Sequence, residues 1–216
     1  MVAPGHPRPT DSNLLVSFPG TMSGRARREA VARLRALGDP APVAPAALSR
    51  GVLAVRTTLE PHGVVRDLRA LCRQDAGALR HTSRWVPIDL WTAPDLESMK
   101  QAVTALRGRI APEETWRMTI ERRPGTALDP EAVIRTLASL VPAKVDLAHP
   151  QKILLVELFV DRVAFAVVTR DEVLAAATVA LLAAGPEPSA AGPTPAQEPG
   201  GGDAATSRPG RMGSGI

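Results

Sequence analysis

The sequence has few cysteines, aromatic residues and histidines, and these are the residue types from which many metal, catalytic and base-stacking sites are built. It contains 216 residues but a single cysteine, Cys72, which excludes an internal disulfide and any zinc site built from several cysteines. It has no Tyr and only three Phe and three Trp, so stacking of bases on aromatic side chains is not expected as a main mode of nucleic-acid recognition. Glycine motifs for phosphate or dinucleotide binding are missing, and the four His fall in different predicted elements. No catalytic or metal-binding constellation is predicted, and no cofactor.

Long hydrophobic runs are also missing. The longest nearly uncharged apolar stretch, residues 173–185, is too short for a helix that crosses a bilayer, and residues 1–12 have no apolar core typical of a secretory signal. These absences favour a soluble cytoplasmic protein without a membrane partner. Residues 1–12 are predicted to be a flexible lead-in. Residues 185–216 are rich in Pro, Gly, Ala and Ser, which predicts a disordered tail.

The basic residues are distributed unevenly. The net charge is +4, yet residues 13–91 hold twelve Arg against six acidic residues, whereas residues 92–175 hold eleven Lys or Arg against twelve acidic residues. A positive field over the first part attracts a polyanion without selecting a sequence. A GC-rich genome would explain why only three of the 26 basic residues are Lys. It would not explain the asymmetry.

Hydrophobic periodicity divides residues 13–91 into six elements. Strands are predicted at residues 13–18, 43–48, 51–57 and 80–90, and helices at residues 25–37 and 60–74. The order β-α-β-β-α-β predicts a ferredoxin-like domain within an α+β protein. The second helix carries Arg66, Arg69 and Arg73 on the side opposite its apolar face, where they either face solvent or meet a polyanion.

Residues 92–184 are predicted to form a second domain, with the boundary near residue 92. A capping box that begins at Thr92 opens the first helix. Residues 115–121 alternate between polar and apolar as a half-buried strand does, and Asp129 followed by Pro130 begins another helix. The apolar runs 153–160 and 163–169 are typical of strands buried on both faces, and a closing helix is expected over residues 171–183.

Glu157 interrupts the first of these apolar runs. A charged group inside a central strand must form an ion pair or reach the surface. We therefore expect Glu157 to face a basic neighbour such as Arg117 or Arg122, in a structural role.

The order of the elements in the second half also carries a family resemblance. EETWRMTIERR, a helix, KVDLAHPQKILLVELF, a tight turn and AFAVV follow one another within residues 80–175. This pattern resembles the THUMP domain, an RNA-binding module of tRNA-modifying proteins, which is often preceded by a ferredoxin-like domain. It most resembles the stand-alone THUMP adaptor that partners the tRNA cytidine acetyltransferase.

The resemblance implies a non-catalytic protein that binds the acceptor end and stem of tRNA and presents it to a separate enzyme. That enzyme would form N4-acetylcytidine and would itself bind acetyl-CoA and ATP. Basic residues at the matching strand ends and loops would meet the 3′ end of tRNA; they are Arg122, Arg123, Lys144 and Lys152, with Arg84 as a weaker candidate. Two alternatives stay open: the RNA-binding part of a methylation or thiolation system, and a scaffold that binds only proteins.

Overall fold

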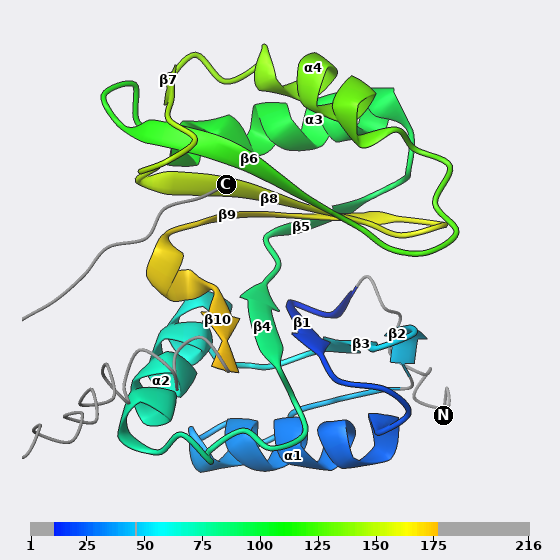
Figure 1. The fold of residues 1–216 in the computed structure, drawn as a ribbon, viewed down its shortest axis with the longest axis vertical. Coiled ribbons are helices and arrows are strands. Elements are labelled where there is room, and N and C mark those ends of the chain that lie inside the picture. The colour runs from blue at the N-terminus through cyan, green and yellow to red at the C-terminus, as the bar shows by residue number, and fades with distance from the viewer. Residues whose placement is uncertain (1–10, 46, 177–216) are drawn as a thin grey trace, which may run out of the picture. The chain divides into compact units, whose positions relative to one another are not determined.

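The computed structural model describes residues 11–45 and 47–176, and its strands form two five-stranded sheets accompanied by four α-helices (Figure 1). The α+β class expected from the sequence is thereby confirmed. The first sheet has the strand order β10-β4-β1-β3-β2. Its strands are β1 (Leu14–Ser17), β2 (Ala47–Ser49), β3 (Val52–Val55), β4 (Arg84–Pro87) and β10 (Leu174–Ala175), and its helices are α1 (Ser23–Ala36) and α2 (Pro61–Gln74).

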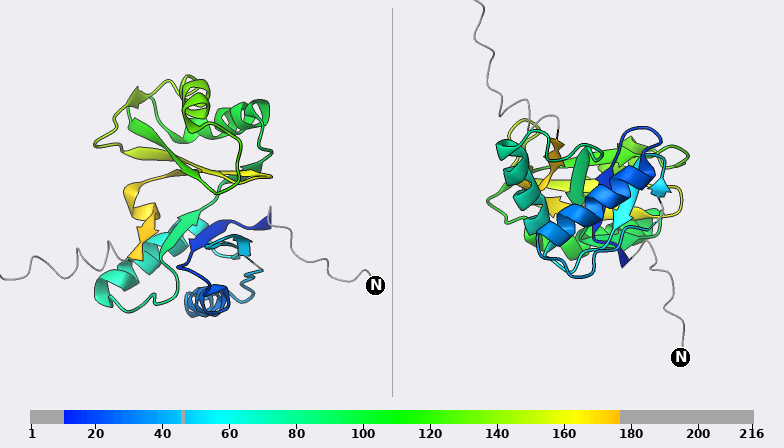
Figure 2. Two further views of the ribbon diagram at one scale, coloured as in Figure 1. Left: turned by 45° about the vertical axis from the view of Figure 1, so that its right-hand side comes forward. Right: turned by 90° about the horizontal axis from the view of Figure 1, so that it is seen from below.

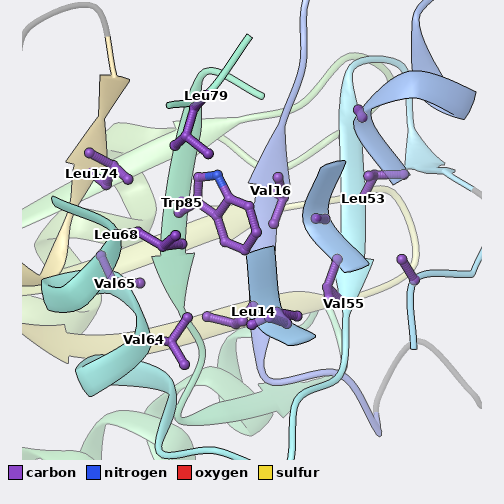
Figure 3. Close-up of a cluster of buried hydrophobic side chains, with 14 of the residues drawn as sticks. Leu14, Val16, Leu53, Val55, Val64, Val65, Leu68, Leu79, Trp85 and Leu174 are labelled. Atoms are coloured by element: carbon purple, nitrogen blue, oxygen red, sulfur yellow. The ribbon is translucent and has the colours of Figure 1, made fainter. Parts of the chain in front are cut away.

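Strand alternation gives the first sheet two apolar faces. β1 pairs antiparallel with β3 and with β4, and β3 pairs antiparallel with β2. Because side chains alternate along a strand, Leu14 and Val16 point to one face and Leu15 to the other. Leu14, Val16 and the fully buried Trp85 pack with Leu68 of α2 (Figure 3). Leu34 of α1 belongs to the same cluster. Helices α1 and α2 therefore cover this face.

The second sheet has the strand order β5-β9-β8-β6-β7. Its strands are β5 (Leu90–Thr92), β6 (Thr115–Arg122), β7 (Lys144–Val145), β8 (Lys152–Leu158) and β9 (Val163–Val168). Its helices are α3 (Leu96–Leu106) and α4 (Pro130–Ala138), with 3-10 turns η2 (Arg107–Arg109) and η3 (Arg170–Glu172). β6 runs parallel to β7 and β8, whereas β9 is antiparallel to β8 and β5. Met99 of α3 and Leu137 of α4 pack on Trp116 of β6.

The helix-free faces of the two sheets pack against each other. Leu15 and Val52 of the first sheet share an apolar cluster with Ala164 of β9, and Val86 of β4 shares another with Leu155 and Val168. β8 and β9 therefore meet helices on one side and strands on the other. This arrangement explains why both apolar runs are buried along nearly their whole length, as their composition predicts.

Two helix starts show where local sequence signals succeed and fail. The prediction for α4 is confirmed, since the Asp129 carboxylate accepts hydrogen bonds from the backbone N–H groups of Glu131 and Ala132. For α3 the predicted helix is present, but its predicted start at Thr92 is wrong. Thr92 is the last residue of β5, and Asp95 caps the helix through a hydrogen bond from Ser98 N, 2.8 Å from its Oδ1.

The single strand predicted over residues 80–90 is also wrong. It is divided into β4, which belongs to the first sheet, and β5, which belongs to the second. Asp89 lies between them and its carboxylate accepts a hydrogen bond of 2.8 Å from Val167 N. The chain crosses from one sheet to the other here while its side chains stay largely buried, so apolar periodicity gives no sign of the break.

Segments at the two ends of the described chain differ from expectation as well. The closing helix predicted over residues 171–183 is wrong at its start, because η3 and then β10 occupy residues 170–175, and β10 pairs with β4. Residues 177–183 and the tail predicted over residues 185–216 lie outside the described residues. So do residues 1–10 of the predicted lead-in, while Ser12 is buried and its carbonyl accepts a hydrogen bond from Trp91 Nε1.

Two features are absent from the described part of the chain. None of its helices combines the length and hydrophobicity that crossing a bilayer requires. Nor do residues 11–45 and 47–176 bring together three or more His, Cys, Asp or Glu side chains in a group that could hold a metal ion. Cys72 is buried in the apolar core between the first sheet and its helices, where burial raises the pKa of its thiol.

Candidate nucleic-acid interface

Strand pairing separates the four basic residues that the resemblance implicates into two groups. Lys144 is paired with Thr115 and Lys152 with Trp116, at the beginning of β6. Arg122 ends the same strand. A rise of about 3.3 Å per residue puts the two ends of this eight-residue strand about 23 Å apart. Lys144 and Lys152 therefore lie at the same end of the sheet, and Arg122 with Arg123 lies at the other end. Because Thr115 and Trp116 are consecutive, the two lysines start from opposite faces of that sheet end.

The β7–β8 loop, residues 146–151, is held in shape at the Lys144 end. Arg117 Nη1 donates to Leu147 O over 3.2 Å, and Arg170 Nη2 donates to Ala148 O over 2.6 Å. Within the loop, Asp146 Oδ1 accepts hydrogen bonds from the backbone N–H groups of Ala148 and His149. Two guanidinium groups, that of Arg117 from β6 and that of Arg170 from η3, thus fix the loop backbone.

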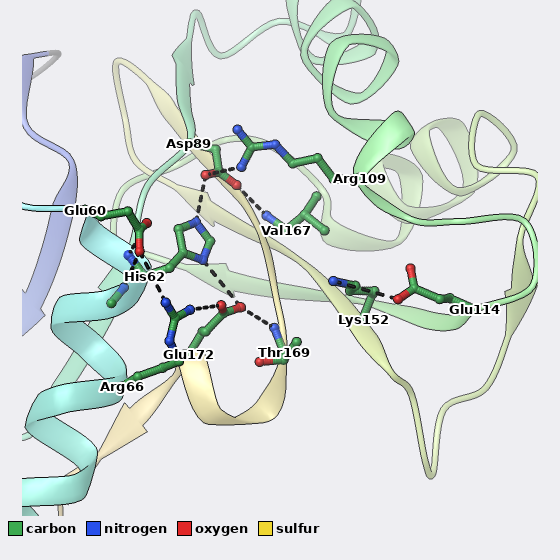
Figure 4. Close-up of polar contacts among 11 residues, drawn as sticks. Glu60, His62, Arg66, Asp89, Arg109, Glu114, Lys152, Val167, Thr169 and Glu172 are labelled. Carbon is green, nitrogen blue, oxygen red and sulfur yellow. Dashed lines mark hydrogen bonds and ion pairs between the residues drawn. The ribbon is translucent and has the colours of Figure 1, made fainter.

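The surroundings of this loop are basic. Cationic or titratable side chains come from β6, β7, β8, the loop itself and η3; they are Arg117, Lys144, Lys152, His149 and Arg170. Of the two nearby acids, Glu114 lies 3.8 Å from Lys152 Nζ (Figure 4). The other is Asp146, whose pKa is lowered mainly by the hydrogen bond from the His149 N–H and, to a smaller extent, by the charges of His149 and Lys144. Among the described residues, Lys152 is the only one of these cations that forms an ion pair with an acid.

Two large apolar side chains stand out from this basic surface. Val145 is 53% exposed and Leu147 is 71% exposed. Because the loop backbone is fixed, these side chains are presented to solvent at no further ordering cost. The arrangement can bind a flexible anionic chain, with cations meeting charge and Leu147 meeting an apolar surface of the ligand.

The basic residues at the other end of β6 differ strongly from one another. Arg122 is exposed and donates only to Thr126 O, over 2.7 Å. Arg123 instead donates to Glu157 Oε2 through Nη2 at 2.6 Å and Nε at 3.0 Å. Arg84 of β4 reaches the other carboxylate oxygen of Glu157 at 2.5 Å. Arg84 and Arg123 are thus already occupied within the protein.

Glu157 therefore forms ion pairs with arginines, as expected, but with different arginines from those predicted. The prediction named Arg117 or Arg122, whereas Arg84 and Arg123 make the contacts. The carboxylate side chain is 3% exposed, and the two guanidinium groups reach it from β4 of the first sheet and from the residue after β6. This buried ion triad spans the interface between the sheets.

The arginine stripe of α2 also meets acids of the same chain. Arg66 contacts Glu172 at 2.5 Å, and Arg73 lies 3.5 Å from Asp171. Arg69 lies 3.1 Å from Asp171 and donates to Val173 O over 3.0 Å. The stripe therefore holds η3 and the beginning of β10 against α2. That these three arginines bind RNA stays a prediction.

Arg69 is the member of the stripe with the largest expected structural effect. Its side chain is mostly buried and makes two contacts with the η3–β10 segment. Arg69→Ala is expected to cost about 1–2 kcal/mol and to speed amide hydrogen exchange at Leu174 and Ala175. The exposed Arg73→Ala should change stability by less than about 0.5 kcal/mol. Equal exchange rates at β10 in both variants would contradict the holding role of Arg69.

A second polar network surrounds His62 at the beginning of α2 (Figure 4). His62 Nε2 lies 2.9 Å from Asp89 Oδ1, and its Nδ1 lies 3.4 Å from Glu172 Oε2. Asp89 also pairs with Arg109 at 2.6 Å. Burial opposes a charged imidazole, but the hydrogen bond and charge of Asp89, with those of Glu172, outweigh it and raise the pKa of His62.

Comparison with known proteins gives structural neighbours only. No family model and no curated protein matches the sequence. Among solved structures, PH1313 from Pyrococcus horikoshii Ot3 is similar with a TM-score of 0.51 and 13% identity, over 73% of this chain and 54% of that chain. A 4-thiouridine synthetase–RNA complex with bound ATP has a TM-score of 0.44 and 12% identity, over 73% of this chain and 42% of that chain.

The THUMP domain of THUMP domain-containing protein 1 is another neighbour. It is 32% identical over 34% of this chain and 84% of that domain, with a TM-score of 0.30. The likeness to PH1313 shows a shared fold. The chain spans about half the length of PH1313 and less of the synthetase.

Arg117, His149 and Arg170 are site residues that the sequence analysis did not select. A usable signal existed for Arg170, since it follows a strand that pairs antiparallel with β8 and so ends beside Lys152. Arg117 occupies a polar position of a half-buried strand, and His149 lies in a loop. In either place a side chain that faces solvent and one that binds a ligand give the same sequence pattern, so the sequence alone does not identify these two residues.

Proposed function

We propose that this protein is a THUMP-domain protein that binds tRNA without catalysing a reaction and presents the tRNA to a separate modifying enzyme. The observation that carries the proposal is the fixed β7–β8 loop with its exposed Leu147, surrounded by basic side chains of β6, β7, β8 and η3. It lies within KVDLAHPQ, one of the segments on which the family resemblance rests.

The single-stranded acceptor end of tRNA suits this loop better than a duplex does. Its phosphates can meet Lys144, Lys152 and Arg170, which have free or weakly paired nitrogens at the surface. Its unpaired bases expose apolar faces that a duplex keeps stacked, and these can contact Leu147. The acceptor stem would then be bound by backbone shape rather than by sequence.

The first sheet supports the wider resemblance. Four of its five strands lie in the order β4-β1-β3-β2 with antiparallel neighbours, and β10 adds a fifth strand beside β4. We propose on this basis that residues 13–91 form the ferredoxin-like domain that the resemblance implies. The resemblance to the acetyltransferase adaptor favours a partner that forms N4-acetylcytidine. Participation in tRNA methylation or thiolation is the second candidate, in line with the neighbouring 4-thiouridine synthetase.

Lys144→Ala/Lys152→Ala is the variant that tests the site. With an unmodified tRNA transcript, affinity is expected to fall about tenfold. The slope of log affinity against log salt should flatten by about 0.7 to 0.9 per lost phosphate contact. Fluorescence anisotropy across a salt series measures both quantities. Lys100→Ala/Arg135→Ala removes the same charge from the exposed sides of α3 and α4 and serves as the control.

A transcript without its single-stranded 3′ end separates end binding from stem binding. Wild-type protein should bind it more weakly, and the double variant should lose little further affinity. Equal losses in the two double variants would mean that only net charge matters, and the β7–β8 loop would then not be the site. A wild-type chain that binds no tRNA would overturn the proposed function itself.

A further inference from the structure

Helix α1 has an arginine-rich outer surface that none of the contacts above uses. Five of its fourteen residues are Arg and one is acidic. That acid, Glu29, is occupied, because its carboxylate accepts hydrogen bonds from the backbone N–H groups of Arg80, His81 and Thr82 and from the Thr82 hydroxyl. The helix therefore presents an uncompensated positive charge.

This surface is hollowed. A groove of about 560 Å³ runs beside α1 and is lined by Gly24, Arg27, Arg28, Val31, Ala32, Arg35 and Ala44. Arg27 is fixed at its edge by a hydrogen bond of 2.8 Å from Nε to Ala44 O. Arg28 and Arg35 are exposed and form no ion pair with an acid in the described part of the chain. Their positions, seven residues apart, are separated by about 10.5 Å along the helix.

The apolar floor of the groove favours an acidic protein helix over a nucleic acid as its ligand. Between the two exposed arginines lie Val31 and Ala32, and Ala44 faces them from across the groove. A nucleic-acid backbone gains from rows of donors and little from an apolar floor. An amphipathic protein helix gains from both, because acids seven residues apart match Arg28 and Arg35 while apolar residues between them fill the floor.

The position of α1 in the fold also favours a protein partner. Helix α1 lies on the face of the first sheet that α2 shares (Figure 2). The second sheet, with the β7–β8 loop, covers the opposite face. A protein bound in the groove would thus leave the proposed tRNA site uncovered, as an adaptor between two partners requires.

From this geometry we infer that the α1 groove, lined by Arg27, Arg28, Arg35 and Val31, docks an acidic amphipathic segment of a protein partner. The inference concerns a second surface of the proposed adaptor. It names the chemistry of the partner segment as acids spaced two helical turns apart with apolar residues between them.

The probe is a fluorescent helical peptide of about 14 residues, with two Glu seven positions apart and Leu at the two positions between them on the same face. Wild-type protein is expected to bind it with micromolar to submillimolar affinity. Arg28→Ala/Arg35→Ala should weaken binding about tenfold. Arg25→Ala removes an exposed charge from the same helix outside the groove and should weaken it less than twofold.

A second variant tests the groove without removing any arginine. Ala32→Glu puts a carboxylate four residues after Arg28 and three before Arg35, where it would pair with both and occupy the floor. It should reduce peptide binding at least tenfold with an unchanged melting temperature. A control peptide with Gln in place of both Glu should bind wild-type protein about tenfold more weakly than the acidic peptide does.

Three results would overturn the inference: no binding of the acidic peptide by wild-type protein, equal binding by Arg25→Ala and Arg28→Ala/Arg35→Ala, or full binding by Ala32→Glu. Affinity for the tRNA transcript is measured in parallel. If Arg28→Ala/Arg35→Ala instead loses tRNA affinity with a flatter salt slope, the groove binds RNA and not protein. Absence of tRNA binding in the wild type bears on the proposed function alone, since the peptide arm needs no RNA.

Discussion

Replacing Glu157 with Gln is expected to destabilise the protein by about 3–5 kcal/mol, because it leaves two partly buried guanidinium groups without their carboxylate. Arg84 and Arg123 are 20% and 19% exposed in their side chains, and Glu157 is 3% exposed. At about 2–4 °C per kcal/mol for a chain of this size, the melting temperature should fall by roughly 6–20 °C.

Asp161→Asn is the matched control. Asp161 pairs with Arg162 in the exposed turn after β8, and its side chain is 63% exposed. Exposed pairs contribute about 0–1 kcal/mol, so this variant should melt within about 2 °C of the wild type. Similar melting temperatures for the two variants would show that Glu157 does not hold the sheets together.

The same triad changes how the neighbouring arginines should be tested. Arg122→Ala removes an exposed side chain whose only contact is with Thr126 O, so it should leave stability almost unchanged and report on RNA binding. Arg123→Ala weakens the triad and would lower RNA binding through unfolding alone. Gly125, with a φ of 89° that favours glycine, turns the chain just after these residues. The two arginines are adjacent in sequence but differ in role.

Much of the fold follows from local signals. The two apolar runs that form β8 and β9, the start of α4 at Asp129, and the positions of α1 and α2 could all be predicted from periodicity and capping residues. These features depend on side chains a few residues apart. The chain division between β4 and β5 could not be predicted, because burial is continuous across Asp89 while the pairing partner changes.

The candidate sites were less predictable for a related reason. An arginine looks the same in sequence whether it meets solvent, a phosphate or an acid far along the chain. Arg84 lies 73 residues from Glu157, and Arg66 lies 106 residues from Glu172. Only strand order shows that Arg170 and Lys152 share one end of the sheet while Arg122 lies at the other. Charge asymmetry located basic segments but not their partners.

Replacing Asp89 with Ala is expected to cost about 3–5 kcal/mol. The Asp89 side chain is 4% exposed and meets His62, Arg109 and the Val167 N–H. Burial by itself would raise the pKa of Asp89, but the hydrogen bonds from His62 and the Val167 N–H, and the charges of His62 and Arg109, lower it. Removal of this carboxylate leaves the Val167 N–H without its acceptor and leaves His62 with Glu172 as its remaining acidic partner, whereas Arg109, 53% exposed, is reached by water.

The network also gives stability a pH dependence with a definite sign. The raised pKa of His62 means that its contribution is fully present below about pH 6.5, its ordinary pKa, and is lost as pH rises through the folded-state pKa. Asp89 and Glu172 have lowered pKa values, so their contributions are present above about pH 4.5 and are lost as pH falls through the folded-state pKa values. The network should stabilise most between about pH 4.5 and 6.5.

His62→Gln isolates the alkaline side of this profile, because Gln carries no charge at any pH. Wild-type protein should be more stable than His62→Gln near pH 6, and the difference should shrink steadily toward pH 9. Asp89→Asn removes the nearest charge from the imidazole, so the alkaline fall should become smaller in that variant while Glu172 still contributes. Thermal denaturation of the three proteins from pH 5 to 9 measures these differences, and the subtraction cancels the titration of other His residues. Parallel profiles for wild type and His62→Gln would mean that the pKa of His62 is the same in the folded and the unfolded protein. The network would then be held by Arg109 and Arg66 instead.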